Sequence, residues 1–125
     1  MIKNLLLIGA GGFIGSIARY LVSKLNISVS LFAIPVGTLL VNVLGSFVIG
    51  FLIGLADKST ILNTGWRMFL MVGLCGGFTT FSTFTGENLV LLHNGQYASL
   101  FAYTGLSVVL GFTAVFFGYA STNIL

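Results

Sequence analysis

Residues 73–87 read Gly-Leu-Cys-Gly-Gly-Phe-Thr-Thr-Phe-Ser-Thr-Phe-Thr-Gly-Glu, inside an apolar segment that is long enough to cross a membrane. The stretch contains the adjacent pair Gly76 and Gly77, five hydroxyl side chains and one carboxylate. Each glycine weakens a helix by about 1 kcal/mol relative to alanine, and Thr and Ser side chains compete for backbone hydrogen bonds. Irregular backbone at membrane depth is tolerated only where protein buries it or it lines a wet cavity. The stretch therefore predicts a helix break that exposes backbone carbonyls, followed by a half-helix with a polar and aromatic face. Membrane proteins tend to bind ions at breaks of this kind.

The composition is that of a membrane protein. Of the 125 residues, 57% are hydrophobic and 6% are charged, and the mean hydropathy is +1.11. Since a spanning helix needs about 20 apolar residues, we expect an all-α membrane protein with one four-helix transmembrane domain over residues 1–125. The helices are expected at roughly residues 5–22, 36–56, 68–93 and 97–119, with a break in the third. The first apolar segment lacks a small-residue cleavage pattern, so we expect it to be retained rather than removed as a signal peptide.

The basic residues are dispersed along the chain. The net charge of +3 therefore forms no patch, and no nucleic acid is expected as a partner. If the helices alternate in direction, Lys3, Lys58 and Arg67 lie on one side of the membrane, whereas Arg19 and Lys24 lie on the other. This difference of one (three minus two) gives the positive-inside rule little to act on. Such a chain can insert both ways and pair as an antiparallel, dual-topology homodimer, but so few charges also make the count noisy, and the count does not decide between these readings.

Two polar side chains inside or near the predicted helices each have two explanations. Asn42, which shares a helix face with Thr38, must find partners or face lipid at a cost of several kcal/mol. Its amide either hydrogen-bonds a neighbouring helix or binds a ligand. Arg19, near the end of the first helix, either snorkels to the interface or lines an electropositive vestibule that attracts anions.

The aromatic and acidic side chains of the third helix are also ambiguous. Phe81 and Phe84 share a face by their i, i+3 spacing, which is usually a sign of core packing. Their ring edges carry partial positive charge, so they can alternatively line a path for an anion. If ionised and exposed to an anion, Glu87 would repel it. We therefore expect Glu87 near an entrance or hydrogen-bonded to a hydroxyl such as that of Thr83, its i, i+4 neighbour.

Small residues indicate where helices approach closely. The four-residue spacing of Gly11 and Gly15 in the first helix, and of Gly50 and Gly54 in the second, is the small-xxx-small pattern of close helix contacts. Cys75 is the single cysteine, so it forms no disulfide within the chain, and it is interpreted as a small core residue.

With these residues in view, the chain resembles the Fluc family of bacterial fluoride channels, also called CrcB. The resemblance covers nearly the whole length. Its most specific part is Gly-Gly-Phe-Thr-Thr-Phe-Ser-Thr-Phe at 76–84, supported by the Gly-Thr-Leu-Leu-Val-Asn block at 37–42 and by the glycine-rich first helix, which ends in Arg19 and Tyr20. It implies a dual-topology homodimer in the bacterial inner membrane, with two pores through which fluoride leaves the cytoplasm passively. Such a protein is not an enzyme, and it gives the cell fluoride resistance.

The resemblance also implies site residues. Backbone carbonyls of Gly76 and Thr79 would bind a structural sodium ion at the dimer centre, and Arg19 would line the vestibule. Thr85 stands where Ser is common in the family, which keeps the hydroxyl and adds a methyl group. The implied fluoride-pore residues are Asn42, Phe81, Ser82, Thr83, Phe84, Thr85, Glu87, Tyr103 and Ser107.

Two other classes of protein compete with this hypothesis. A small dual-topology multidrug transporter would need a membrane carboxylate that cycles protons against a cationic substrate, and Glu87 is the sole candidate. That class explains neither the Gly76-Gly77 pair nor the hydroxyl track. A structural or assembly protein is the other alternative. A liposome assay that compares fluoride, chloride and a proton-coupled cation separates all three.

Overall fold

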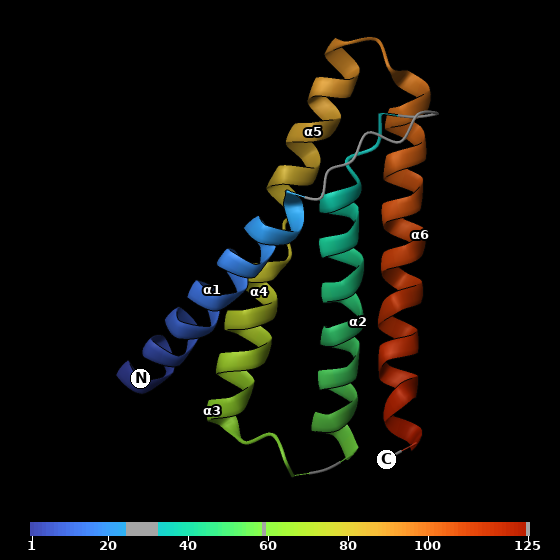
Figure 1. Cartoon of the computed structure of the whole chain (residues 1–125). Coiled ribbons are helices and arrows are strands. Elements are labelled where there is room, and N and C mark those ends of the chain that lie inside the picture. Colours follow the sequence, from blue (N-terminus) through green and yellow to red (C-terminus); the bar gives the residue numbers. More distant parts are fainter. Residues whose placement is uncertain (25–32, 59, 125) are drawn as a thin grey trace.

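The computed structural model describes residues 1–24, 33–58 and 60–124, and within these ranges all regular structure is helical. Most of the predicted first loop, residues 25–32, therefore lies outside the described residues. The helices are α1 (Ile2–Ser23), α2 (Val36–Lys58), α3 (Thr64–Arg67), η1 (Met68–Cys75), α4 (Gly76–Phe78), α5 (Phe81–His93), α6 (Tyr97–Ser121) and η2 (Thr122–Ile124) (Figure 1).

Within the described residues, four helical segments are long and apolar enough to cross a membrane, so this is a multi-pass membrane protein, as predicted. The third segment begins at Thr64, before the predicted start at residue 68. Its start is set by Asn63, whose side-chain oxygen accepts a hydrogen bond of 2.9 Å from the backbone N–H of Trp66 and caps the helix. The four segments are Ile2–Ser23, Val36–Lys58, Thr64–His93 and Tyr97–Ile124.

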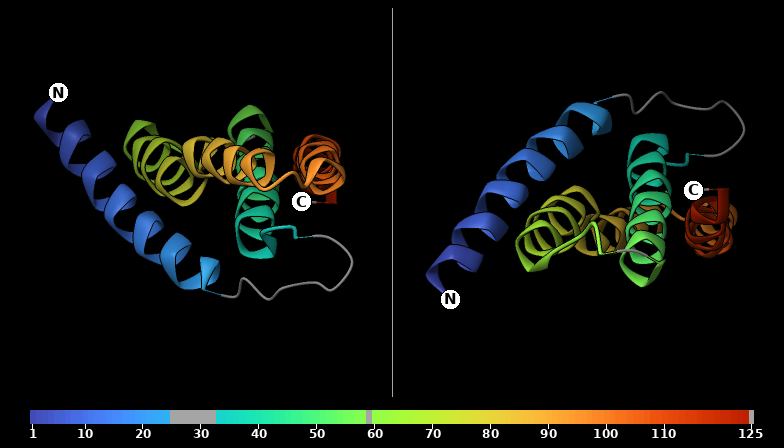
Figure 2. Two further views of the ribbon diagram at one scale, coloured as in Figure 1. Left: turned by 90° about the horizontal axis from the view of Figure 1, so that it is seen from above. Right: turned by 90° about the horizontal axis from the view of Figure 1, so that it is seen from below.

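The segments form two packed pairs. α2 lies along α6, and α1 crosses η1 and α4 (Figure 1). Seen from above and below, α2 stands between α6 and the third segment, while α1 runs along the outer side (Figure 2). The amino end of α1, the carboxyl ends of α2 and α6 and the start of α3 all lie toward the lower end of Figure 1. Consecutive segments thus run in opposite directions.

Glycines bring the backbones of α1 and the third segment into contact. A Cβ atom on Gly11 would lie 3.0 Å from the Cα of Gly73, and one on Gly15 would lie 3.2 Å from the carbonyl carbon of Gly77. Neither position has room for a larger side chain, which confirms the close contact that the Gly11-Gly15 spacing predicts. Gly73 and Gly77 face this pair, although the sequence does not show that these two glycines contact the first helix.

Glycines also bring α2 close to the α6 end of the chain. A Cβ atom on Gly50 would lie 2.9 Å from the carbonyl carbon of Val115, and one on Gly54 would lie 2.7 Å from Cγ2 of Thr122. From the other side, a Cβ atom on Gly118 would lie 3.0 Å from the backbone nitrogen of Phe51. The predicted role of Gly50 and Gly54 in close packing is therefore confirmed.

The backbone of the third segment changes type along its length. η1 is a π-helix, which leads into the single turn of α4. Thr79 (φ −82°, ψ 156°) and Thr80 (φ −150°, ψ 119°) follow with extended dihedrals, before α5 begins. Gly76 and Gly77 are both helical, contrary to the expectation that this pair interrupts the helix. Gly77 lies directly against α1, where a Cβ atom would lie 2.8 Å from the carbonyl oxygen of Gly12.

Candidate functional site

Asn42 on α2 forms two hydrogen bonds with the backbone of Thr80. Its Nδ2 donates to the Thr80 carbonyl at 3.0 Å, and its Oδ1 accepts from the Thr80 N–H at 2.8 Å. A residue with extended dihedrals leaves its main-chain groups without helical partners, and the amide supplies both a donor and an acceptor. Asn42 therefore joins α2 to the third segment, while one of its two N–H bonds is not used in this pair.

Two threonine side chains satisfy neighbouring backbone groups. Thr80 Oγ1 accepts from the N–H of Thr83 at 3.2 Å and caps α5. The N–H and the hydroxyl of Thr79 both donate to the carbonyl of Cys75, at 3.0 and 2.9 Å. Thr80 was not assigned a role from the sequence. A signal was present, because Thr is a preferred residue just before a helix start.

Two carbonyls of this segment lose their helical donors. In a continuous α-helix the carbonyl of Gly76 would accept from the N–H of Thr80, four residues on. The carbonyl of Thr79 would likewise accept from the N–H of Thr83. These two N–H groups donate instead to Asn42 Oδ1 and to Thr80 Oγ1. The main-chain oxygens of Gly76 and Thr79 are thus candidate ligands for a cation.

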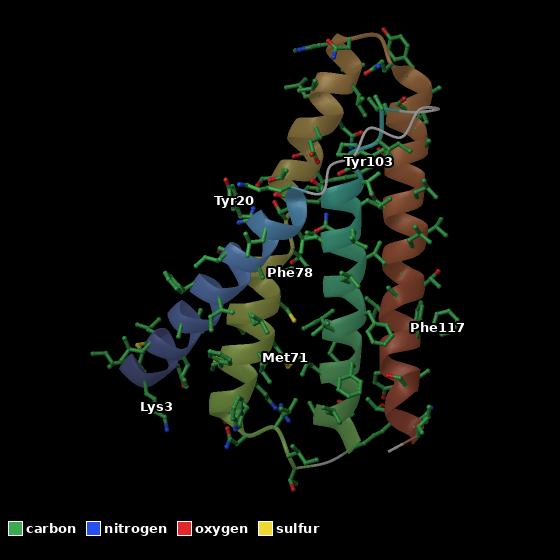
Figure 3. The ribbon with its side chains drawn as sticks, viewed as in Figure 1. Lys3, Tyr20, Met71, Phe78, Tyr103 and Phe117 are labelled. Atoms are coloured by element: carbon green, nitrogen blue, oxygen red, sulfur yellow. The ribbon has the colours of Figure 1, made fainter. Side chains whose placement is uncertain are left out.

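An open hollow of about 400 Å³ borders these carbonyls on the α2 side. Met71 lies on its η1 side, and in Figure 3 it is seen on the third segment. Among the described residues no group of three His, Cys, Asp or Glu side chains is placed to hold a metal ion. Main-chain, hydroxyl and amide oxygens are therefore the candidate ligands here. The hollow is lined by Asn42, Gly45, Ser46, Ile49, Met71, Cys75, Gly76, Thr79, Thr80 and Phe81.

Arg19 reaches the end of α4 from α1. Its Nε donates to the carbonyl of Gly77 at 3.0 Å, in the last turn before the extended residues. A cation there satisfies a carbonyl that has no continuing helix to donate to it. Arg19 and Tyr20, the latter labelled in Figure 3, also line a second hollow of about 220 Å³ together with Thr83. Arg19 thus pairs with the backbone while bordering a hollow, and its guanidinium has further N–H groups to offer.

Glu87 connects three helices. Its Oε2 accepts from the hydroxyl of Thr38 on α2 at 3.0 Å, and its Oε1 accepts from the hydroxyl of Tyr103 on α6 at 2.9 Å. Thr38 and Tyr103 are buried, with 2% and 0% of their surface exposed. The predicted hydroxyl partner of Glu87 is confirmed, but the partners are these two residues rather than Thr83. The helix face that Thr38 shares with Asn42 does not by itself predict this contact.

Three aromatic rings form a row beside this carboxylate. The ring centroid of Phe84 lies 5.8 Å from that of Phe81 and 5.0 Å from that of Tyr103, which is labelled in Figure 3. Phe81 is 76% exposed, so it is not a core residue of this chain. The row therefore runs from the interior at Tyr103 to the outside at Phe81.

The remaining predicted pore residues make fewer hydrogen bonds to other helices. Ser82, Thr83 and Thr85 are exposed on α5, and the Thr85 hydroxyl donates to the Ser82 carbonyl at 3.0 Å. Ser107 lies on α6, and its buried Oγ has no hydrogen-bond partner among the described residues. The same holds for Oδ1 of Asn88, which had not been assigned to the site. The structure thus brings Asn42 to the Thr80 backbone and Glu87 to Tyr103, but it does not hydrogen-bond Ser107 to either pair.

Known proteins match this chain along most or all of its length. Residues 6–119 match the family model described as CrcB-like protein, Camphor Resistance (CrcB). A fluoride-specific ion channel FluC of Azobacteroides pseudotrichonymphae is 41% identical over 123 residues, which cover 98% of each chain. The protein of that name from Elusimicrobium minutum is 44% identical over 126 residues, covering 100% of this chain and 98% of the relative. The protein of that name from Methanococcus maripaludis is 49% identical over 108 residues, which cover 86% of this chain and 83% of the relative.

Proposed function

Because this chain belongs to the CrcB family, we propose that it is a fluoride-selective ion channel that lets fluoride leave the cytoplasm passively. The observation that carries the proposal is the 41 to 49% identity to relatives named fluoride-specific ion channels, over most or all of their length. Fluoride would move down its electrochemical gradient, and an inside-negative potential drives an anion outward. The protein would act in the plasma membrane, which is the inner membrane if the cell is a Gram-negative bacterium.

The side chains near Thr80 offer partial charges suited to a small anion. Fluoride is strongly hydrated, so a pore must replace its water without holding the ion too tightly to release it. The unused N–H of Asn42, the exposed hydroxyls of α5 and the ring edges of Phe81 and Phe84 would do so in sequence. The hydroxyls of Thr38 and Tyr103 occupy oxygens of Glu87, which reduces its repulsion of an anion. The proposed pore also includes Ser82, Thr83, Thr85 and Ser107, with Arg19 in the vestibule.

We further propose that Thr79 and Thr80 are the break in the third membrane span, and that a sodium ion binds there. The ligands would be the Gly76 and Thr79 carbonyls of two chains that meet at this point. Support comes from the loss of their regular donors, because carbonyl oxygens without donors suit a hard cation. The ion would neutralise the carbonyl dipoles and hold the two chains together.

The proposed assembly is an antiparallel homodimer with two pores. The nearly balanced basic residues permit insertion in both directions. A chain with four spans and short connections cannot enclose a wide pore alone, and the hydroxyls of α5 are exposed in the single chain. A second copy would cover them and complete each path, and a two-fold axis in the membrane plane would give two pores and one central sodium site.

A growth assay tests the proposed function. The chain is expressed in a bacterium that lacks its own fluoride exporter, and growth is measured against rising fluoride concentration. Expression is expected to restore growth, and the variant Phe84→Ile at equal membrane abundance is expected not to. Growth that stays fluoride-sensitive with the wild-type chain in the membrane contradicts the proposal.

A further inference from the structure

Among the described residues, Lys3 is the basic residue at its end of the molecule whose side chain has no partner. Its ammonium group makes no hydrogen bond or ion pair with any residue of the ranges 1–24, 33–58 and 60–124. The other two basic residues at this end are engaged: Lys58 Nζ donates to Thr122 Oγ1 at 2.9 Å, and Arg67 Nε donates to the carbonyl of Leu62 at 3.2 Å. The ammonium group of Lys3 is therefore available to an anion.

Lys3 lines a hollow of about 380 Å³ between α1 and the start of the third segment. In Figure 3 its side chain points toward the lower end of the molecule, where α3 begins. No carboxylate is among the described residues that line the hollow, so none of them neutralises the ammonium group. The lining residues are Lys3, Leu7, Asn63, Gly65, Trp66 and Phe69.

The walls of this hollow are held in place by specific contacts. Asn63 Oδ1 accepts from the N–H of Trp66 at 2.9 Å, and the rings of Trp66 and Phe69 meet edge to face with centroids 6.1 Å apart. A Cβ atom on Gly65 would lie 3.4 Å from Cδ1 of Leu7, so α1 and α3 lie close together here. The shape of the hollow is thus defined before any ligand arrives.

We propose that this hollow binds the phosphate group of an anionic phospholipid. It lies at the end of two membrane-spanning segments, the depth at which headgroups lie and at which Trp is typically found. The Lys3 ammonium supplies charge and donors to the phosphate, and Leu7 and Phe69 offer apolar surface to an acyl chain. Free inorganic phosphate would use the same ammonium group but leave this apolar surface uncovered, which is why we assign the lipid as the ligand.

Trp66 makes the proposal directly testable, because it is the single tryptophan of the chain and half of its surface is exposed. The full chain is reconstituted in phosphatidylcholine vesicles that contain equal mole fractions of either brominated phosphatidylglycerol or brominated phosphatidylcholine. Quenching of Trp66 fluorescence is expected to show a preference of about fivefold for the anionic lipid, the factor expected for one lysine near an anionic surface. Lys3→Gln is expected to abolish this preference, and Lys3→Arg to retain it.

Lys24→Gln is the matched control, because it removes the same charge at the opposite end of α1, where Lys24 Nζ lies 4.8 Å from the ring centroid of Tyr20. It is expected to keep the preference. Equal quenching by the two lipids in the wild-type chain overturns the proposal, as does equal loss of preference in Lys3→Gln and Lys24→Gln. Inorganic phosphate is added in a further arm. Unchanged quenching supports the lipid, and displacement of the brominated lipid by phosphate overturns the assignment.

Discussion

Asn42 and Thr80 are joined by two hydrogen bonds of 3.0 and 2.8 Å, one in each direction, between a side-chain amide and a backbone amide. This pair replaces helical bonds at a point where the third segment has extended dihedrals. The same pair diverts the N–H that would otherwise reach the Gly76 carbonyl. The conformation of the proposed ion site thus depends on a side chain that comes from a different helix.

The variant Asn42→Asp tests this dependence. An ionised Asp side chain has no N–H to donate, so a carboxylate oxygen would face the Thr80 carbonyl, and an unpaired group there costs about 1 to 3 kcal/mol. Both the free energy of unfolding and fluoride efflux are expected to fall. Asn63→Asp is the control for the chemical change, because its oxygen still accepts from the N–H of Trp66. Full activity of Asn42→Asp would show that this pairing is dispensable.

Phe84→Ile tests the aromatic row. Isoleucine keeps an apolar side chain but removes the ring edge that would face an anion and the contact with Tyr103 at 5.0 Å. Fluoride efflux from liposomes is expected to slow about tenfold, which corresponds to about 1.4 kcal/mol in the barrier. Phe116→Ile, at a residue that is 71% exposed on α6, is expected to have no effect. Equal rates for wild type and Phe84→Ile would remove the ring-edge argument.

Gly15→Ala tests the backbone contact between α1 and the third segment. The added Cβ would lie 2.9 Å from the backbone nitrogen of Phe78, so one helix must move. A lower thermal unfolding temperature is expected. Gly9→Ala in the same helix meets nothing within 4 Å and is expected to be neutral or slightly stabilising, since Ala favours a helix by about 1 kcal/mol over Gly. Two variants of equal stability would argue against a close contact at Gly15.

Tyr103→Phe tests the link between Glu87 and α6. The change removes one hydroxyl and leaves Oε1 of Glu87 without its donor, at an expected cost of about 1 to 3 kcal/mol in the free energy of unfolding. Tyr97→Phe removes the same hydroxyl from a residue that is 57% exposed and is expected to be neutral. If both variants unfold alike, the Glu87 bond contributes no stability.

Replacement of sodium tests the proposed cation site. Purification with N-methylglucamine in place of sodium is expected to lower the fraction of dimer measured by cross-linking, because unneutralised carbonyl dipoles of two chains would face each other. Return of sodium is expected to restore it. An unchanged dimer fraction through repeated exchange would contradict a structural role for the ion.

The sequence predicts the spans well because membrane helices need long apolar runs, and four such helices are found among the residues that the structure describes. Close packing at Gly11 and Gly15 was also predictable, since only small residues permit it. The helical state of Gly76 and Gly77 was not predictable, because helix propensity does not report long-range contacts such as that of Gly77 with Gly12 of α1. The partners of Glu87 could not be predicted either, because Thr38 is 49 positions away and helical spacing reports only near neighbours.

The initial rate of fluoride release from proteoliposomes, with valinomycin to balance the potassium charge, tests the central claim most directly. Vesicles that contain the wild-type chain are expected to release fluoride rapidly while retaining chloride, and those with Phe84→Ile to release fluoride slowly. Retention of fluoride by vesicles that contain the wild-type chain, or loss of chloride as fast as fluoride, would contradict the claim that the chain is a fluoride-selective channel.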